Sequence, residues 1–369
     1  MADLLVAGAG MAGLVAAAEA RRLGAEPLVV EKLRRPGGSM RLSSGVIWRH
    51  RDFDRFREEC PDGDERLQQL LFERLDDDLS WLESLGGPVV TTETGNPLTA
   101  GTRFDPAGLA DALVDAAGGL VPAEGAGAGL GAAGVRVAER LREPPADVPL
   151  VLATGGFAAD RKLLEEHVSP EAGHAFLRAA PGSTGDGLRI GLAAGGGASA
   201  GLDQVYARAM PAPPARIPEE DLVRLSQLYA RHAEVTNERG ETYETATWSE
   251  IDVAQWQLRQ PGGRAWFSVP VDRLGERVRE RTVADMVDSA EAAGAPVRRE
   301  QEHVTVETVA GVTTTLGGLA IDEHAQAAPG VFAGGADAGG IATGGYASGL
   351  AAALVFGRIA ARAALGERP

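Results

Sequence analysis

Three glycines near the start of the chain have the spacing that can hold a phosphate group. Gly8, Gly10 and Gly13 follow a short apolar run and open an alanine-rich stretch, and Glu31 follows 18 residues after Gly13. Such glycines allow a tight turn, close approach of the backbone to a pyrophosphate, and close helix–strand packing. A helix N-terminus supplies free N–H groups for the phosphates, and Glu31 can accept hydrogen bonds from an adenosine ribose. We therefore predict a dinucleotide site.

The elements around these glycines supply the context that this interpretation needs. Residues 3–8 read as a buried strand, 12–23 as a helix and 27–31 as a second strand, which together form a βαβ unit. The alternative is a plain glycine-rich turn with a surface glutamate, and the βαβ context favours the cofactor. A second match at 129–134 has no apolar strand before it, so we interpret it as a chance match.

Further elements can be predicted from periodicity and capping residues. Leucines recur at helical spacing over 65–85, and Asp105 with Pro106 is typical of a helix start, here over 105–117. The apolar run at 148–153 predicts a strand followed by a tight turn.

The end of the chain contains a second set of glycine-rich turns. One is Gly334-Gly335-Ala336-Asp337, and another leads through Ser348 into a helix predicted over 349–363, with Ser348 as its N-cap. A helix N-terminus aimed at a flavin would stabilise the anion formed when the flavin accepts hydride. A site built from both ends implies one large cofactor, and FAD fits best. An ordinary capped helix is the alternative.

The predicted domain boundaries follow from a cofactor site that both ends of the chain build. Residues 1–198 and 311–369 form the first and closing parts of an FAD-binding domain, and 199–310 form an inserted domain. Asp186 is expected as an exposed acid in a tight turn before a helix at 186–195. The further predicted cofactor contacts are Met11, Ala12, Lys32, Gly37, Gly38, Ser39, Met40, Ser43, Ser44, Gly45, Thr154, Gly155, Gly156, Asp186, Gly335, Ala336, Asp337, Gly349 and Leu350.

Composition excludes several classes of protein. The 369 residues carry 36 Lys and Arg against 52 Asp and Glu, a formal charge of −16, and no basic stripe for nucleic acid. Cys60 is the single cysteine, which leaves no disulfide framework and fits a cytoplasmic protein. Apolar runs are too short for a membrane span, and the six histidines lack metal-ligand spacing, so we expect no metal.

Taken together, these motifs resemble the flavoprotein family of fumarate reductase and succinate dehydrogenase, which includes 3-ketosteroid Δ1-dehydrogenases and tricarballylate dehydrogenase-like proteins. The resemblance spans nearly the whole chain. It implies FAD, a capping domain, and hydride transfer between a substrate carbon and flavin N5. The expected fold class is α/β, with a Rossmann-like FAD-binding domain built from both termini and an inserted, shortened α+β capping domain. The matching segments, in family order, are 8–13 with Glu31, 37–39, 153–157, 184–187, 260–266, 315–319, 329–335 and 356–360.

Departures from the family pattern bear on the substrate. Thr314 stands where the fumarate-type pattern has a His, and Ala342 or Gly344 stands where it has an Arg. Residues 204–208 lack the expected His, and the cap is short. Without these cations a dicarboxylate would be poorly compensated, so fumarate reduction is not expected. Ser39 stands near the position of the flavin-linked His of covalent members, so noncovalent FAD is expected.

The resemblance also suggests a candidate catalytic residue. Ketosteroid Δ1-dehydrogenases place a Tyr in the region of Tyr346, which implies that this hydroxyl polarises a substrate carbonyl. Tyr206 and Arg208 are further catalytic candidates. The alternatives to these roles are packing ones.

The predicted function is α,β-desaturation of a neutral carbonyl compound, or its reverse, by an FAD-dependent dehydrogenase or reductase acting on CH–CH groups. One alternative is a carboxylated metabolite bound through residues such as Arg208 or Arg264. Another is a flavin-binding protein without catalysis. The expected partners are a small-molecule substrate and an electron donor or acceptor whose identity the sequence leaves open, as it does the oligomeric state.

Overall fold

The computed structural model describes residues 2–122 and 133–367. The described chain separates into two compact units. Unit 1 comprises residues 1–159, 180–202 and 314–369, and unit 2 comprises 160–179 and 203–313. Residues 160–179, which the sequence places with the first domain, group with unit 2 because they contain a strand that pairs within its sheet.

The central sheet of unit 1 has strands from both ends of the chain side by side. Its strands are parallel except at the β17 edge, as expected for a Rossmann-like domain. β1 lies between β2 and β7, in register from Leu4 opposite Pro27 and from Leu5 opposite Leu150. The strand order is β17 (Gln326–Ala328), β18 (Val331–Ala333), β7 (Leu150–Leu152), β1 (Leu4–Ala7), β2 (Pro27–Glu31) and β6 (Gly134–Val137).

The helices of unit 1 include those predicted from sequence, with ends shifted by one or two residues. Asp105 caps α4 through the Gly108 N–H at 2.6 Å, and Ser348 caps α9 through the Ala351 N–H at 3.2 Å, as predicted. The helices are α1 (Met11–Arg22), α2 (Phe53–Glu59), α3 (Glu65–Ser84), α4 (Pro106–Ala116), α6 (Asp186–Ala193) and α9 (Gly349–Ala364).

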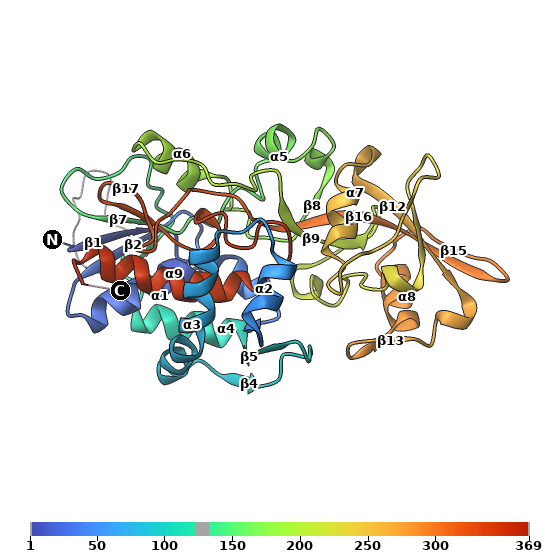
Figure 1. Cartoon of the computed structure of the whole chain (residues 1–369), viewed down its shortest axis with the longest axis horizontal. Coiled ribbons are helices and arrows are strands. Elements are labelled where there is room, and N and C mark those ends of the chain that lie inside the picture. Colours follow the sequence, from blue (N-terminus) through green and yellow to red (C-terminus); the bar gives the residue numbers. More distant parts are fainter. Residues whose placement is uncertain (1, 123–132, 368–369) are drawn as a thin grey trace. The chain divides into compact units, whose positions relative to one another are not determined.

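The first and last helices of unit 1 are packed and charge-paired. α9 lies beside α1 (Figure 1), and alanines and glycines at the contact let the two backbones approach closely. Glu19 of α1 is fully buried and accepts hydrogen bonds from Arg22 at 2.9 Å, Arg358 at 3.2 Å and Arg362 at 2.6 Å. Arg358 also pairs with Asp78 of α3. The buried carboxylate is therefore compensated by three cations.

A smaller antiparallel sheet of unit 1 has the order β3 (Val46–His50), β5 (Thr99–Phe104) and β4 (Val89–Thr91). Gly45 precedes β3, and a Cβ on it would lie 2.0 Å from the Phe104 carbonyl oxygen, so only glycine fits. β3 contacts α9, which brings the segment after the predicted Ser43–Gly45 turn next to the closing helix. Two 3₁₀ helices, η1 (Gly38–Leu42) and η7 (Gly335–Asp337), complete the loops.

Unit 2 is an α+β unit built on the long strand β16. Both β8 and β9 pair with β16, and β12 pairs with it in antiparallel register from Arg264 opposite Val309 to Pro270 opposite His303. The main path of the sheet is β11 (Thr242–Tyr243), β10 (Glu234–Thr236), β12 (Arg264–Pro270), β16 (His303–Thr315) and β15 (Val297–Arg299), with β8 (Phe176–Leu177) and β9 (Val205–Pro211) beside β16.

The core of unit 2 lies between this sheet and its helices. It includes Tyr229, Phe267, Met286 and Val306. The helices are α5 (Arg161–His167), α7 (Ile251–Gln257) and α8 (Val283–Ala292), the short hairpin is β13 (Arg277–Val278) with β14 (Arg281–Thr282), and the 3₁₀ helices are η2 (Ala172–His174), η3 (Glu219–Asp221), η4 (Ala230–His232), η5 (Pro261–Gly263) and η6 (Val271–Arg273).

Two kinds of feature are absent from the described residues. No helix in residues 2–122 and 133–367 is both long enough and apolar enough to cross a membrane. Across the same residues, no group of three or more His, Cys, Asp or Glu side chains is arranged to hold a metal ion. The second glycine motif at 129–134 lies outside the described residues except for its last two, and Gly134 begins β6.

Candidate functional site: an FAD-binding unit

The turn between β1 and α1 contains glycines with different roles. Gly8 has a φ of +104°, and a Cβ there would lie 2.2 Å from the Ala153 carbonyl oxygen. A Cβ on Gly13 would lie 1.9 Å from the Gly8 carbonyl oxygen. A Cβ on Gly10 would meet no described protein atom within 4 Å, and no described side chain caps the helix there. The α1 N-terminus therefore has N–H groups that no described side chain caps, next to a glycine with open space at its Cβ, which fits a pyrophosphate.

Glu31 at the end of β2 connects this turn to the next loop. One carboxylate oxygen accepts the Ala9 N–H and the other accepts the Leu33 N–H, both at 2.8 Å. A carboxylate oxygen has two lone pairs, so each retains capacity for a ribose hydroxyl. Glu31 thus shapes the glycine turn as well as offering acceptors beside it.

Gly37 and Gly38 pass directly beside the glycine turn. The Gly37 N–H donates to the Ala9 carbonyl at 2.7 Å, and a Cβ on Gly38 would lie 3.3 Å from the Gly10 Cα. Both have positive φ, +107° and +51°, which glycine adopts readily. The structure therefore brings these two predicted contacts next to Gly10.

The following residues form η1 and the turn into β3. Met40 is buried, and the Ser39 hydroxyl accepts the Ala180 N–H at 2.9 Å. Ser43 Oγ donates to the Met40 carbonyl at 2.7 Å and accepts the Gly45 N–H at 3.0 Å. The carbonyl of its neighbour Ser44 accepts Arg103 Nε at 3.1 Å. These contacts hold the predicted loop in one conformation within unit 1.

Asp337 of η7 is buried and joins glycine-containing loops. Its carboxylate accepts the N–H and the hydroxyl of Thr154 and the Gly156 N–H, the last at 3.0 Å. Thr154 Oγ1 in turn accepts the Gly187 N–H at 2.8 Å. Burial raises the pKa of Asp337, and the backbone donors oppose that rise. Asp337 therefore holds the predicted 154–156 and 335–337 segments together, with Gly155 and Ala336 between the joined groups.

Asp186 is not the exposed acid that the sequence predicts. It is buried as the first residue of α6, where Lys32 Nζ donates to it at 2.9 Å and Arg140 at 2.6 Å. Lys32 also donates to Thr184 Oγ1 at 2.7 Å. Burial alone would raise the pKa of Asp186, but hydrogen bonds from Lys32 and Arg140 outweigh it and lower the pKa. The turn folds the acid inward because these cations compensate it.

Tyr346 lies in the loop that leads to α9. Its ring centroid is 5.1 Å from that of Trp48, and its carbonyl is 3.4 Å from Nε2 of His50. A Cβ on Gly349, which begins α9 before Leu350, would meet no described atom within 4 Å. The N-terminal end of α9 is thus open in unit 1, as the predicted flavin contact requires.

Tyr206 and Arg208 lie two residues apart on β9 of unit 2, on the same face of the strand. Arg208 Nε donates to the Tyr206 hydroxyl at 2.9 Å, and Arg208 also donates to the Ser249 carbonyl. Burial would raise the pKa of Tyr206, but the charges of Arg208, Arg178 and Arg279 outweigh it and lower the pKa to about 8.

Arg178 and Arg279 are not singled out by the sequence. Arg178 follows β8 and is placed by the pairing of β8 with β16, with its own N–H donating to the Val312 carbonyl at 2.8 Å. Arg279 lies between β13 and β14 with its guanidinium over the Trp248 ring at 5.1 Å. No motif links these residues to β9: the pairing of β8 with β16 places Arg178, and only the tertiary fold places Arg279.

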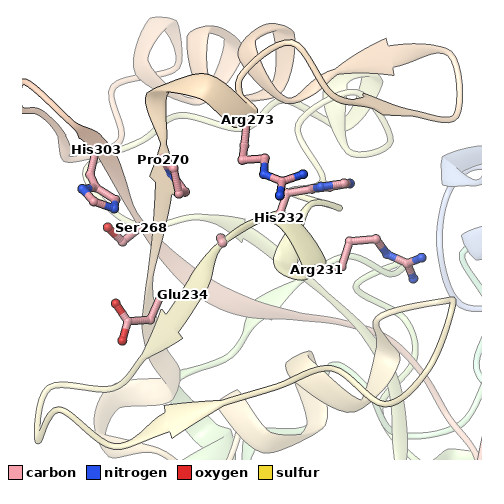
Figure 2. A pocket seen from close by; sticks show the side chains of 8 residues that line it. Arg231, His232, Glu234, Ser268, Pro270, Arg273 and His303 are labelled. Carbon is pink, nitrogen blue, oxygen red and sulfur yellow. The ribbon is translucent and has the colours of Figure 1, made fainter.

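A shallow hollow of about 450 Å³ lies elsewhere on unit 2. Figure 2 shows that its side chains come from η4, β10, β12, η6 and β16. Arg231 pairs with Glu250 at 3.3 Å and Arg273 with Glu276 at 3.1 Å. Both arginines are thus compensated by carboxylates, and none of the predicted site residues lines the hollow.

Comparison with protein families agrees with the geometry of unit 1. The FAD binding domain family matches residues 3–115 and 110–350. The chain therefore belongs to the FAD-binding domain family, and its cofactor is FAD. No curated protein matches the sequence.

Solved structures share the fold over nearly the whole chain. A flavocytochrome c3 fumarate reductase in its open conformation is 21% identical with a TM-score of 0.71, covering 99% of this chain and 78% of that one. The 3-ketosteroid-Δ4-(5α)-dehydrogenase of Rhodococcus jostii RHA1 is 20% identical with a TM-score of 0.67, covering 99% and 96%. The 3-ketosteroid Δ1-dehydrogenase of Sterolibacterium denitrificans is 13% identical with a TM-score of 0.72, covering 99% of each chain.

These likenesses establish the fold. They confirm the predicted fold class, an FAD-binding α/β domain with an insertion. The predicted class of protein, an FAD-dependent oxidoreductase of the fumarate reductase-like family, agrees with both comparisons.

The residues of unit 1 fit FAD. Besides the open α1 N-terminus, Oγ1 of Thr315 and Oγ1 of Thr343 are buried with no hydrogen-bond partner among the described residues. A buried hydroxyl without a partner costs about 1–3 kcal/mol, so such groups point to a bound molecule or water. Ser39 offers no imidazole for a covalent link, and noncovalent binding fits. Neither threonine was among the predicted contacts.

Proposed function

We propose that the protein adds two hydrogens to, or removes them from, the α,β carbon–carbon bond of a carbonyl compound. In the oxidative direction a proton leaves the α-carbon, a hydride leaves the β-carbon, and a C=C bond forms between them. Bound FAD supplies the two-electron acceptor for that hydride at flavin N5. The observation that carries the proposal is Tyr346, held before the open N-terminus of α9 in the FAD-binding unit.

Tyr346 is proposed to donate its hydroxyl proton to the substrate carbonyl oxygen in a hydrogen bond. Loss of the α-proton places negative charge on that oxygen, and a fixed donor stabilises this charge most in the transition state. A phenol suits the role because it donates without itself being charged at neutral pH.

Within unit 2, we propose Tyr206 as an acid–base residue. Its phenol accepts a hydrogen bond from Arg208 at 2.9 Å, and the neighbouring arginines lower its pKa to about 8. A phenolate with such a pKa is accessible near neutral pH and can accept a proton, and the phenol can return it in the reverse direction. Arg208 orients the phenol in this scheme.

A neutral substrate such as a cyclic ketone fits the residues of unit 1. By the family resemblance, Thr314 stands where the fumarate-type pattern has a His, and Ala342 or Gly344 stands where it has an Arg. A dicarboxylate would lose hydration without gaining paired charges at these positions. The proposed substrate is therefore a small carbonyl compound, with a separate electron donor or acceptor as the second partner.

The test is an anaerobic titration of the purified protein, followed through the flavin absorbance band at about 450 nm. Cyclohexanone and succinate are added to the oxidised protein, and 2-cyclohexen-1-one, 4-androstene-3,17-dione and fumarate to the dithionite-reduced protein. Bleaching by a ketone, or reoxidation by an enone, supports the proposal. A response to the dicarboxylates alone contradicts the neutral substrate, and flavin that none of them changes favours a non-catalytic flavoprotein.

A second candidate is a carboxylated substrate of the same reaction class. The observation that favours it is the group Arg178, Arg208 and Arg279, whose charges act together on Tyr206 in unit 2. Arg264, the other sequence candidate, pairs with Glu307. The titration with succinate and fumarate distinguishes this candidate.

We also propose a cytoplasmic location. The single cysteine, Cys60, is buried as a free thiol, which a reducing compartment suits.

A further inference from the structure

The backbone of Tyr346 is held on both sides. Its carbonyl lies 3.4 Å from Nε2 of His50, and it makes a backbone hydrogen bond to the thiol of Cys60. Burial and the charge of Glu59 raise the pKa of that thiol to about 12, so Cys60 stays a neutral thiol. The ring of Trp48, 5.1 Å from the Tyr346 ring between centroids, is a third contact. The contacts with His50, Cys60 and Trp48 thus fix the residue that we propose to polarise the substrate carbonyl.

The glycines before Tyr346 prevent this loop from shifting toward α2. A Cβ on Gly345 would lie 1.4 Å from the Glu59 carbonyl oxygen, and Gly344 has a φ of +89°. A backbone packed this closely can move only if α2 moves with it. The position of the Tyr346 ring then depends on the side chains that contact it.

Packing alone does not explain why a polar imidazole stands at position 50, in contact with Tyr346. His50 ends β3, is 5% exposed, and lies between Trp48 at 5.2 Å and Phe56 at 5.4 Å between ring centroids. Its Nδ1 is buried without a hydrogen-bond partner among the described residues. An apolar residue of the same shape would avoid the cost of an unpartnered Nδ1, so the imidazole lowers the stability of the fold at this position.

The protonation of His50 follows from its surroundings. Burial lowers the pKa of the imidazole, although the Tyr346 carbonyl and Glu59 act in the opposite direction and Arg55 adds to the lowering. A neutral imidazole carries one N–H, and Nε2 is the nitrogen that faces an acceptor. The tautomer with hydrogen on Nε2 therefore donates to the Tyr346 carbonyl and leaves Nδ1 bare.

We propose that His50, as the neutral Nε2–H tautomer, and Trp48 are positioning residues that aim the Tyr346 phenol at the substrate carbonyl. His50 holds the backbone of Tyr346 and Trp48 holds its ring, so the hydroxyl needs no reorganisation when charge develops on the substrate. The inference rests on the proposed function of Tyr346.

The test is a double-mutant cycle between His50 and Tyr346. His50→Phe keeps an aromatic ring between Trp48 and Phe56 but removes the donor, and His50→Gln restores an N–H at a similar distance along the side chain. Each is made alone and together with Tyr346→Phe. The readout is the rate at which 2-cyclohexen-1-one reoxidises the reduced, FAD-loaded protein.

A positioning role for His50 predicts a lower reoxidation rate only in proteins that keep the Tyr346 hydroxyl. His50→Phe should slow reoxidation about three- to tenfold, the worth of one net hydrogen bond, with flavin content unchanged. The same change in the Tyr346→Phe background should have little further effect, and His50→Gln should recover part of the rate. Phe56→Leu is the matched packing control, and its effect should be equal in both backgrounds.

A second readout needs no substrate. Nitrogen-15 spectra of the histidine side chains, with the His50 signal assigned by its loss in His50→Phe, should show hydrogen on Nε2, a bare Nδ1, and no protonation through the ordinary range near pH 6.5. Hydrogen on Nδ1, or ordinary titration, overturns the inference.

The two proposals fail in different ways. If Tyr346→Phe reoxidises as fast as the unchanged protein, the proposed function of Tyr346 fails whatever His50 does. If Tyr346→Phe is slow but His50→Phe has no effect, or slows both backgrounds equally, only the positioning role fails.

Discussion

Units 1 and 2 present their candidate chemistry in different ways. In unit 1 the candidate cofactor site consists mainly of backbone: glycine turns, helix N-termini, and carboxylates such as Asp337 that hold loops by accepting backbone N–H groups. In unit 2 the candidate groups are charged side chains around one phenol, brought from β8, β9 and the β13–β14 turn. Backbone sites leave motifs in a sequence, whereas converging side chains leave none.

The two units also use charge differently. In unit 1 the buried carboxylates Glu19 and Asp186 are each surrounded by cations, so their charges stabilise the fold. In unit 2, Arg208 donates to a neutral phenol and to a carbonyl, and its charge lowers the pKa of Tyr206. Changes of charge should therefore affect stability in unit 1 and titration behaviour in unit 2.

The largest expected effect is on a glycine of unit 1. Gly13→Ala places a Cβ 1.9 Å from the Gly8 carbonyl oxygen, and we expect it to cost about 3 kcal/mol of stability because backbone must move. Thermal unfolding of the FAD-free protein measures this. Gly10→Ala is the control: its Cβ meets open space, so stability should hold while FAD affinity falls about tenfold. Equal unfolding temperatures for both variants would contradict a packing role for Gly13 that Gly10 does not share.

The next effect is the acid sensitivity of unit 1. Burial would raise the pKa of Glu19, but Arg22, Arg358 and Arg362 outweigh it and lower the pKa to about 2. A lowered folded-state pKa contributes stability above the unfolded value of 4.5, and that stability is lost as the pH falls toward 2. Denaturant unfolding should show a loss of up to about 3 kcal/mol over this range.

Glu19→Gln removes the titrating group and should flatten this part of the pH profile. It should also be less stable than the parent at neutral pH, because it removes one counter-charge from the buried Arg358, which keeps only Asp78, and removes the partner of Arg22 and Arg362. Glu26→Gln, at an exposed ion pair, is the matched control and should keep the parent profile. An unchanged profile in Glu19→Gln would show that other acids dominate.

The third prediction concerns Tyr346 of unit 1 and separates FAD binding from turnover. Tyr346→Phe should leave FAD bound and lower turnover about 100-fold, because a positioned donor contributes roughly 10² to 10⁴ in rate. Flavin absorbance and single-turnover kinetics with 2-cyclohexen-1-one measure the two properties. Tyr243→Phe is the control: this phenol binds Asp252 in unit 2 and should be replaceable with little loss of rate.

The smallest effect concerns Tyr206 in unit 2. Arg208→Gln removes the closest positive charge, so the pKa of Tyr206 should rise from about 8 toward its ordinary value of 10. Ultraviolet titration of phenolate, with Tyr206→Phe subtracted, measures this change. Arg264→Gln alters a charge in the same unit that is already paired with Glu307, so it should leave the titration in place. A shift of equal size in both variants would deny Arg208 a specific role.

Much of unit 1 could be predicted from sequence because its signals are local. The strands at 4–7 and 27–31 and the helix between them lie within one residue of their predicted bounds. Asp105 and Ser348 cap helices as predicted, since a cap depends on a few adjacent residues. The prediction that Asp186 is an exposed acid is wrong, because the partners that compensate the buried carboxylate, Lys32 and Arg140, are far from it in sequence.

The sequence by itself determined the βαβ unit, the glycine turn for a pyrophosphate, the closing helix and, through the order of its motifs, the FAD-binding family. These features depend on backbone conformations that neighbouring residue types dictate. Only the tertiary structure decided that β8 joins the sheet of unit 2, that arginines converge on Tyr206, and that His50 and Trp48 hold Tyr346. Each of these contacts joins residues from separate elements, and strand register and helix packing bring them together.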